Sequence, residues 1–199
     1  MVKVLVAIPC NNFLEVDCID SLFKTNQRIR EWCELDVRFY SGYSCEMARN
    51  KAIEDMVNNS EADYLFFLDS DIVLEPDSLE KLILANHDII TGIYYKKQSW
   101  SKMAEICRVE NGETIFYQEH EIPENIFKID GCGFGCILIK RSVCINVYNQ
   151  TNKRPFVYQI EPILISEDLW FCNIVAHLNY KIMCHNEVKV GHIWKFQHK

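Results

Sequence analysis

Two aspartates separated by a single residue are the side chains best suited to chemistry. Asp69 and Asp71 directly follow the apolar run Tyr64–Leu68, which is typical of a strand buried on both faces of a parallel sheet. Because ligands bind beyond the carboxyl ends of such strands, these carboxylates are placed to hold a hard cation together with a nucleotide diphosphate. We expect Mg²⁺ or Mn²⁺ there. The alternative is that both side chains only cap the following turn.

A second pair of acids, Glu167 and Asp168, follows Ser166. This pattern predicts a helix from Glu167 to about Leu178 with Ser166 as its N-cap. Acids in the first helical turn are favoured by the helix dipole whatever their function. The pair therefore has a structural interpretation beside a chemical one.

Alternating strands and helices must position the first pair. Apolar residues spaced by three and four predict helices, and uninterrupted apolar runs predict strands. This alternation is typical of βαβ units with right-handed crossovers and a parallel sheet. The predicted strands are Met1–Pro9, Asp36–Tyr40, Tyr64–Leu68 and Asp88–Tyr95. The predicted helices are Glu15–Ile29, one capped by Ser44 with Ala48, Ala52, Met56 and Val57 facing inward, and one with Pro76 in its first turn and Leu79, Leu82 and Ile83 facing inward.

The second half of the chain differs in character. Asn111-Gly112 between two strand-like segments predicts a β-hairpin. The Gly-rich segment Asp130–Gly135 leads into a strand, and two short strands, KIMCH and VKVGHIW, close the sequence. We expect one domain over residues 1–199, with a nucleotide-binding half at 1–95 and an acceptor-side half at 96–199.

Composition narrows the function classes. A net charge of −7 and a pI near 5.4 argue against nucleic-acid binding, which depends on counterion release by Lys and Arg. No apolar run approaches membrane-spanning length and no signal-peptide cleavage pattern is present, so we expect no transmembrane segment and a cytoplasmic location, with peripheral membrane association as an alternative.

The ten cysteines form no CxxC pair, which favours reduced thiols in the core; a zinc site including Cys132 and Cys136 is the alternative.

The chain resembles the GT-A glycosyltransferases, close to the compact members of glycosyltransferase family two and the Anp1-like members. The resemblance rests on six segments that follow the family's order over nearly the whole chain: VLVAIPC, MARNKAI, LDSDIVLEPDSL, GCGFGCILIKR, SEDLWFC and GHIW. It implies an α/β, Rossmann-like single domain with a central mixed, mostly parallel sheet flanked by helices, and an added β-hairpin.

The resemblance implies a metal site. Asp69 and Asp71 match the DxD carboxylates that hold a divalent metal against the two phosphates of a nucleotide sugar, and Asp71 is the better candidate for direct ligation. His192 matches the place of a late metal ligand, and an imidazole favours Mn²⁺ over Mg²⁺. A surface histidine is the alternative interpretation.

Further residues are assigned to the donor and the acceptor in the same way. Arg49 and Asn50 would help to hold the nucleotide, or would instead be solvated residues of a helix surface. Asp168, with Glu167 beside it, would be the base that an inverting transfer needs for the acceptor hydroxyl; the helix dipole weakens such a base unless burial offsets it. The switch-point rule places Pro9, Cys10 and Asn11 at the sheet edge where the base and ribose would lie, with Ser70 among the donor-binding residues. The glycines around Gly133 and Phe134 allow close backbone approach, so we expect this loop to form the floor of the pocket. Cys10 departs from the Thr or Ser often found at its position.

The expected function is metal-dependent transfer of a sugar from a nucleotide-diphosphate donor, expected to be a UDP-sugar, to an acceptor hydroxyl with inversion. The acceptor class, whether saccharide, lipid-linked or protein, stays open. Lys96 and Lys97, which leave the strand Asp88–Tyr95, either meet the donor phosphates or are solvated. The alternatives are a nucleotidyltransferase of similar fold, which would carry a Gly-rich basic loop where this chain has CNNFLEVD, and a catalytically silent nucleotide-sugar-binding module.

Overall fold

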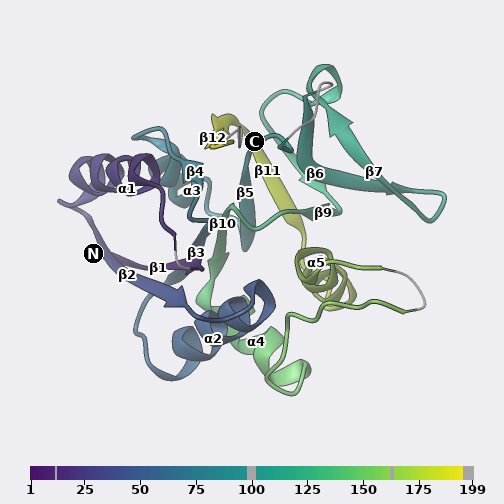
Figure 1. The fold of residues 1–199 in the computed structure, drawn as a ribbon, viewed down its shortest axis with the longest axis horizontal. Coiled ribbons are helices and arrows are strands. Elements are labelled where there is room, and N and C mark those ends of the chain that lie inside the picture. Colours follow the sequence, from purple (N-terminus) through teal and green to yellow (C-terminus); the bar gives the residue numbers. More distant parts are fainter. Residues whose placement is uncertain (12, 98–101, 162–163, 195–199) are drawn as a thin grey trace, which may run out of the picture.

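The computed structural model describes residues 1–11, 13–97, 102–161 and 164–194. A seven-stranded sheet forms its centre, in the order β2-β1-β3-β10-β5-β11-β8 (Figure 1). The strands are β1 (Val2–Cys10), β2 (Cys33–Ser41), β3 (Tyr64–Leu68), β5 (Ile89–Ile93), β8 (Ile126–Ile129), β10 (Cys136–Lys140) and β11 (Ile182–Lys189).

The sheet is mixed but mostly parallel, as expected. Strand β1 pairs in parallel with both β2 and β3, and β5 pairs in parallel with β11. Strand β10 is antiparallel to both of its neighbours, β3 and β5, and β8 is antiparallel to β11. Because β10 comes from the second half of the chain and lies between two strands of the first, the two halves share one sheet.

Helices cover both faces of the sheet, and each face has its own hydrophobic core. Alternate residues of β1 enter opposite cores: Leu5 and Ala7 face α2, α4 and α5, while Val4 and Val6 face α1 and α3. The helices are α1 (Val16–Ile29), α2 (Cys45–Asn58), α3 (Ser78–Ala85), α4 (Arg141–Gln150) and α5 (Glu167–His177). This double coverage explains why β3 and most of β1, β5 and β10 consist of apolar residues.

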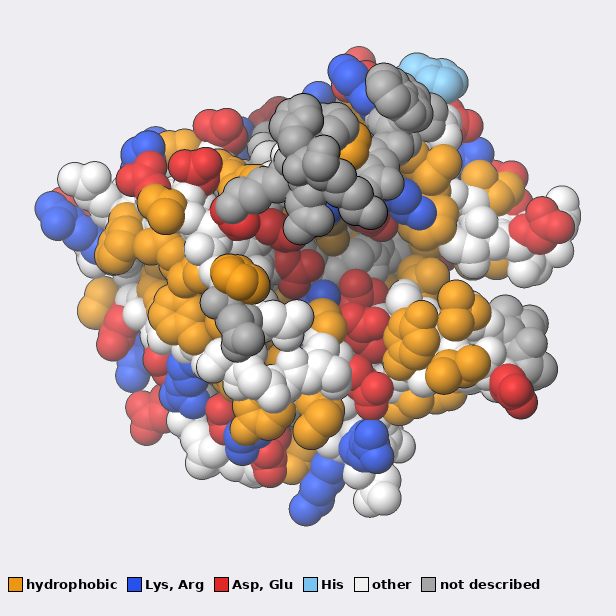
Figure 2. Space-filling model, in the orientation of Figure 1, with side chains coloured by type: hydrophobic (Ala, Val, Ile, Leu, Met, Phe, Trp, Pro, Cys, Tyr) orange, Lys and Arg blue, Asp and Glu red, His pale blue; other side chains and the backbone are white. Residues whose placement is uncertain are grey.

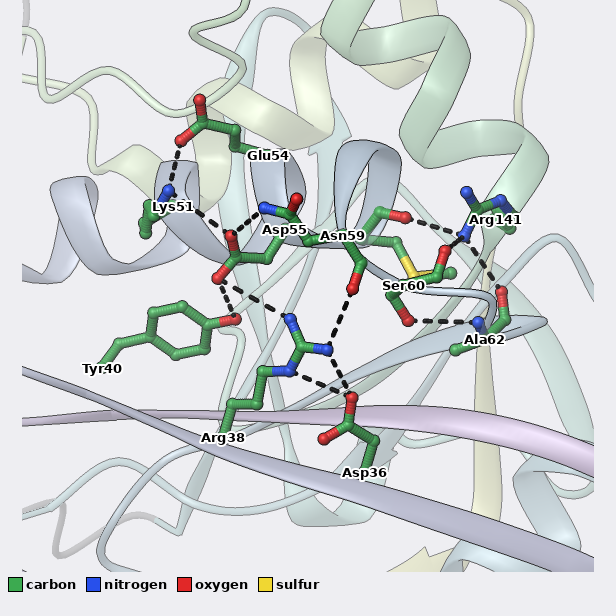
Figure 3. A network of polar contacts seen from close by, with 11 residues as sticks. Asp36, Arg38, Tyr40, Lys51, Glu54, Asp55, Asn59, Ser60, Ala62 and Arg141 are labelled. Carbon is green, nitrogen blue, oxygen red and sulfur yellow. Dashed lines mark hydrogen bonds and ion pairs between the residues drawn. The ribbon is translucent and has the colours of Figure 1, made fainter.

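Helix α2 is anchored at both ends. Ser44 accepts a hydrogen bond from the backbone N–H of Met47 at the start of the helix, as its type predicts. At the other end Arg141, the first residue of α4, donates to the carbonyl oxygens of Met56 (2.8 Å) and Ser60 (2.5 Å) (Figure 3). Arg141 also donates to the carbonyl oxygen of Val57 at 3.1 Å, so two of the carbonyls that a helix C-terminus leaves without an internal partner are satisfied, and α2 is held against α4.

Smaller strands complete the second half. Strands β6 (Met103–Glu110) and β7 (Glu113–Gln118) form the predicted hairpin, and β9 (Gly131–Cys132) extends it to three strands. Asn111 and Gly112 both have positive φ, 52° and 83°, which is what a two-residue hairpin turn requires. A separate pair joins β4 (Ile72–Val73) to β12 (Gly191–His192).

Several elements differ from the sequence prediction. Helix α4 and strand β8 were not expected. The buried residues of α4 have helical spacing, but most of its residues are Val, Cys, Asn and Tyr, which have weak helix propensity, and it lacks a side-chain N-cap. Segment KIMCH and the start of VKVGHIW belong to one strand, β11, whose bulge keeps the two apolar stretches in the same sheet. Helix α3 begins two residues after Pro76.

The cysteines agree with the expectation of reduced thiols. All ten are free, and eight are buried, namely Cys18, Cys33, Cys107, Cys132, Cys136, Cys144, Cys172 and Cys184. Within the described part of the chain, none of the helices has the length and apolar character needed to cross a lipid bilayer.

Candidate active site

A buried arginine stands at the centre of the candidate site. Arg49, in the first half of α2, has only 2% of its side chain exposed. Its guanidinium faces three carboxylates: Asp69 at 3.4 Å, Asp168 at 3.0 Å and Glu167 at 3.6 Å. The side chain thus joins the acids that follow β3 to the acids that open α5.

The surroundings keep this guanidinium in place. It lies over the ring of Phe67 and the ring of Phe134, at 5.6 and 5.4 Å from the centroids, and Nη1 donates to the carbonyl oxygen of Phe134 at 3.5 Å. Burial alone would lower the pKa of Arg49, but the carboxylates of Asp168 and Asp69 outweigh it and raise that pKa. Arg49 is therefore a fixed positive charge rather than the solvated residue of the alternative interpretation.

Asp168 is the most perturbed acid of the site. Burial raises its pKa to about 7, against the lowering effect of the Arg49 guanidinium. Its Oδ2 accepts a hydrogen bond from the backbone N–H of Phe134 at 3.2 Å, and Ser166 caps the helix that carries it. The helix dipole lowers the pKa of an acid at this position, and burial raises it. Because burial outweighs the dipole, Asp168 meets the condition for a useful base.

The small β4–β12 pair brings His192 next to Asp71. His192 pairs with Ile72, and the backbone N–H of Ile193 donates to the carbonyl oxygen of Asp71 at 2.8 Å. As a result the Nε2 of His192 lies 3.7 Å from Oδ1 of Asp71. The other oxygen of Asp71 forms an ion pair with Lys97.

His192 is oriented as a metal ligand would be. Its Nδ1 lies 2.8 Å from the carbonyl oxygen of Tyr95, and because a carbonyl only accepts, Nδ1 carries the proton. In the neutral ring Nε2 then has a free lone pair directed toward Asp71. A histidine that donates its second nitrogen to a carbonyl is the usual arrangement around a bound metal.

The protein groups that could ligate a metal fit an ion that is also bound by a substrate. Among the described residues no group of three or more His, Cys, Asp or Glu side chains is arranged to hold a metal ion. Asp71 and His192 would supply two ligands, and Mg²⁺ and Mn²⁺ commonly take the rest from substrate phosphates and water. Asp69 is less suited to direct ligation, since its carboxylate already faces Arg49.

An open cleft of about 350 Å³ lies beside this group. Six of the predicted site residues line this cleft, together with five residues that were not predicted: Phe13, Glu15, Tyr43, Cys45 and Ala48. The predicted residues that line it are Pro9, Cys10, Asn11, Asp69, Ser70 and Asp71. Figure 2 shows acidic side chains gathered around the hollow in the middle of the face. Strands β1 and β2 end at this edge of the sheet, and Phe13 and Tyr43 lie in the loops that follow them. Their place in the cleft could therefore have been expected from their position in the sequence alone.

Asn50 has a different set of contacts. Its amide nitrogen donates to the carbonyl oxygen of Phe156 at 2.7 Å, and its amide oxygen accepts from the N–H of Phe156 at 3.0 Å. The ring of Phe156 stacks on Phe171 of α5 at 4.8 Å between centroids. Asn50 does not line the cleft, and these contacts tie α2 to the loop before α5.

Gly133 and Gly135 of the GCGFGC segment make room for Tyr94. A Cβ at Gly133 would lie 2.2 Å from the hydroxyl oxygen of Tyr94, and a Cβ at Gly135 would lie 2.9 Å from its ring. The N–H of Gly135 donates to that hydroxyl at 3.0 Å. Phe134 turns its ring into the core and presents its backbone to Asp168. The segment thus contributes backbone groups to the site, and Tyr94 explains why positions 133 and 135 are glycines.

Replacing Gly133 by alanine should therefore destabilise the fold by about 1–3 kcal/mol, the usual cost of overpacking. In the double variant Gly133→Ala with Tyr94→Phe the cost should be smaller than the sum of the two single changes, because the hydroxyl that meets the new Cβ is gone. Urea denaturation measures both. Gly191→Ala, whose new Cβ has its nearest neighbour at 3.3 Å, is the milder control. Strict additivity of the two changes would contradict the proposed packing.

Two residues near the site, Tyr94 and Glu105, were not predicted as site residues because no sequence pattern marks them. Tyr94 packs edge-on against His192, with ring centroids 5.3 Å apart. Glu105 of β6 is half-buried, and burial raises its pKa, opposed by the nearby charge of Lys96. Both lie on segments whose partners are distant in the sequence.

Comparison with known proteins supports the fold. No protein-family model and no curated protein matches the sequence. The chain is similar to the crystal structure of A197 from STIV, with a TM-score of 0.64 and 20% identity over 98% of this chain and 87% of that chain. It is also similar to the crystal structure of GalNAc-T7 with UDP, GalNAc and Mn²⁺, with a TM-score of 0.62 and 11% identity over 98% of this chain and 44% of that one. The mixed, mostly parallel sheet with flanking helices is thus the predicted GT-A fold, whereas membership of family two or the Anp1-like group stays a prediction.

Proposed function

We propose that this chain is a metal-dependent glycosyltransferase that moves a sugar from a nucleoside diphosphate, expected to be UDP, to an acceptor hydroxyl with inversion. The observation that carries the proposal is the arrangement around Arg49. One buried guanidinium holds both Asp69 of the DxD motif and Asp168, a carboxyl whose pKa is near neutral. Arg49 thus fixes the base candidate Asp168 close to Asp69, two residues before the proposed metal ligand Asp71, and glycosyl transfer requires both a base and charge stabilisation on the departing diphosphate.

The cleft provides the donor side. Backbone and side chains of Pro9, Cys10 and Asn11 would meet the base and ribose, and Tyr43 at the rim has an aromatic face for stacking. Asp71 and His192 would hold the divalent cation. When bound, that cation would stabilise the charge that develops on the departing diphosphate. The complex of GalNAc-T7 with UDP and Mn²⁺ is consistent with this chemistry in a chain of the same fold.

Asp168 would act on the acceptor side. The acceptor oxygen forms a bond to the anomeric carbon while the bond from that carbon to the diphosphate breaks, and the hydroxyl proton passes to the Asp168 carboxylate. A base with a pKa near the working pH combines a useful ionised fraction with a useful affinity for the proton. The N–H of Phe134 keeps one carboxylate oxygen oriented throughout.

A screen of nucleotide sugars with Mn²⁺ or Mg²⁺ tests the proposal without knowledge of the acceptor. We expect one donor to bind only with metal and to be hydrolysed slowly, because water can replace the acceptor hydroxyl. Metal-dependent binding with no hydrolysis or transfer would favour the catalytically silent module. Release of pyrophosphate from a nucleoside triphosphate would favour a nucleotidyltransferase, and absence of any nucleotide binding would contradict the whole assignment.

The variant Asp71→Asn should lose metal-dependent nucleotide binding. We expect the affinity for UDP in the presence of Mn²⁺ to fall by more than about 100-fold, since even groups that only orient a ligand are worth roughly 10- to 100-fold. Calorimetric titration of UDP into protein with and without Mn²⁺ measures this. Asp77→Asn, which removes a surface carboxylate paired with Lys81, is the control. Unchanged binding in Asp71→Asn would exclude Asp71 as the ligand.

A further inference from the structure

The two carboxylates of the DxD motif have counter-ions of very different kinds. Asp69 faces Arg49, which has 2% of its side chain exposed and is also held by Asp168 at 3.0 Å. Asp71 faces Lys97, which has 37% of its side chain exposed. The first positive charge is built into the core, whereas the second lies at the surface of the cleft.

The chemistry of the two side chains matches this difference. A guanidinium suits a fixed, multivalent ion pair, whereas a lysine ammonium is a hydrated point charge on a flexible stem. An ion pair as exposed as that between Lys97 and Asp71 contributes little to stability, so its partners exchange easily. Lys97 therefore pairs with Asp71 only weakly, and another cation can replace it.

The pair stands where a divalent cation would have to bind. Lys97 contacts one oxygen of Asp71, and the Nε2 of His192 lies 3.7 Å from the other. A divalent cation on the Asp71 carboxylate would repel the ammonium. Lys97 would then need another anionic partner, and the diphosphate of the donor would be the nearest one available.

We propose that Lys97 is an exchangeable counter-ion of Asp71, which competes with the divalent cation in the free protein and pairs with the donor diphosphate once that cation is bound. This inference rests on the proposed function. Its consequence is that cation and nucleotide bind cooperatively. Lys97 opposes the first binding event and supports the second, and by linkage each ligand raises the affinity for the other.

The neighbouring lysine provides a matched control. The ammonium of Lys96 lies 3.1 Å from the centroid of the Phe116 ring, on the hairpin, and has no ion pair with Asp71 among the described contacts. Lys96→Met removes the same charge one residue away. Any effect that Lys97→Met has beyond Lys96→Met therefore belongs to the contact with Asp71 and not to the general potential of the cleft.

The test measures two affinities that should move in opposite directions. In Lys97→Met the affinity for Mn²⁺ alone should rise by up to about fivefold, the value of an exposed ion pair. The affinity for UDP at saturating Mn²⁺ should fall by roughly 10- to 100-fold, the value of a hydrogen bond to a charged group. Electron paramagnetic resonance of free Mn²⁺ measures the first and calorimetry the second, with Lys97→Gln as a second neutral variant.

The outcomes separate this inference from the proposed function. Opposite shifts in Lys97→Met, absent in Lys96→Met, support the exchange. Unchanged affinities, or a loss of both, overturn it while Mn²⁺-dependent UDP binding by the wild-type chain keeps the proposed function. If the wild-type chain binds no UDP with Mn²⁺, the exchange and the proposed function are overturned together.

Discussion

Asp168→Asn is expected to lower the rate of glycosyl transfer by about 10²- to 10⁴-fold, the usual contribution of a positioned general base. Asparagine has nearly the same shape and can still accept the N–H of Phe134, so the fold and donor binding should be retained. What it cannot do is take the proton of the acceptor hydroxyl. Transfer rates with the donor identified by the nucleotide-sugar screen, together with donor affinity, measure the two effects separately.

The pH dependence gives an independent check on the same residue. The base works in its ionised form, and burial raises the pKa of Asp168 to about 7. The kcat/KM of the wild-type chain, which reports groups of the free enzyme, should therefore rise with pH and reach half its plateau near pH 7. The residual activity of Asp168→Asn should lack this step.

Two comparison variants define what would refute the assignment. Glu167→Gln tests the neighbouring carboxylate, which lies farther from Arg49 at 3.6 Å, and should cost less activity. Asp88→Asn removes an exposed carboxylate paired with Lys140, just before β5 and therefore at the opposite edge of the sheet, and should have no effect. Full activity in Asp168→Asn would remove it as the base, and a larger loss in Glu167→Gln would transfer the role to that residue.

Arg49→Met should destabilise the fold by about 3–5 kcal/mol, the cost of leaving buried charges without their partner. Methionine fills much of the same apolar space over Phe67 and Phe134 but leaves Asp69, Glu167 and Asp168 without a cation. Guanidinium chloride denaturation measures the loss. Arg154→Met, which removes an exposed arginine paired with Glu46, is the control and should cost less than about 1 kcal/mol.

The loss in Arg49→Met should also depend on pH in a defined direction. Arg49 lowers the pKa of Asp168, so its removal should raise that pKa further above its value in the unfolded chain. Between those two values the folded state binds more protons, and stability therefore falls as pH rises. The destabilisation should be smaller at pH 5 than at pH 8. A change below about 1 kcal/mol at pH 8 would mean that the three acids are not held by Arg49 as a buried cluster.

Local patterns were sufficient for much of the fold. The apolar run Tyr64–Leu68, the cap at Ser44 and the Asn111-Gly112 turn each carry their structure within a few residues, and all three are as predicted. Helix α4 was missed because its residues favour no helix by themselves and its packing against α2 stabilises it. Helices, strands and turns were therefore predictable where the intrinsic conformational propensity of their residues agrees with the pattern of burial.

The sequence by itself determined the strands of the first half, β1, β2, β3 and β5, the place of Asp69 and Asp71 at a strand end and the acids that open α5. It did so because strand periodicity, caps and switch points depend on neighbouring residues. Only the tertiary structure decided that Arg49 is the buried centre of the site, that Asn50 holds Phe156, that Tyr94 requires the glycines, and that Lys97 and His192 share Asp71. The ion pairs and hydrogen bonds among them join residues from 20 to 121 positions apart, since β10 enters the middle of the sheet and β12 returns to β4. Their geometry depends on packing, and no local pattern in the chain encodes it.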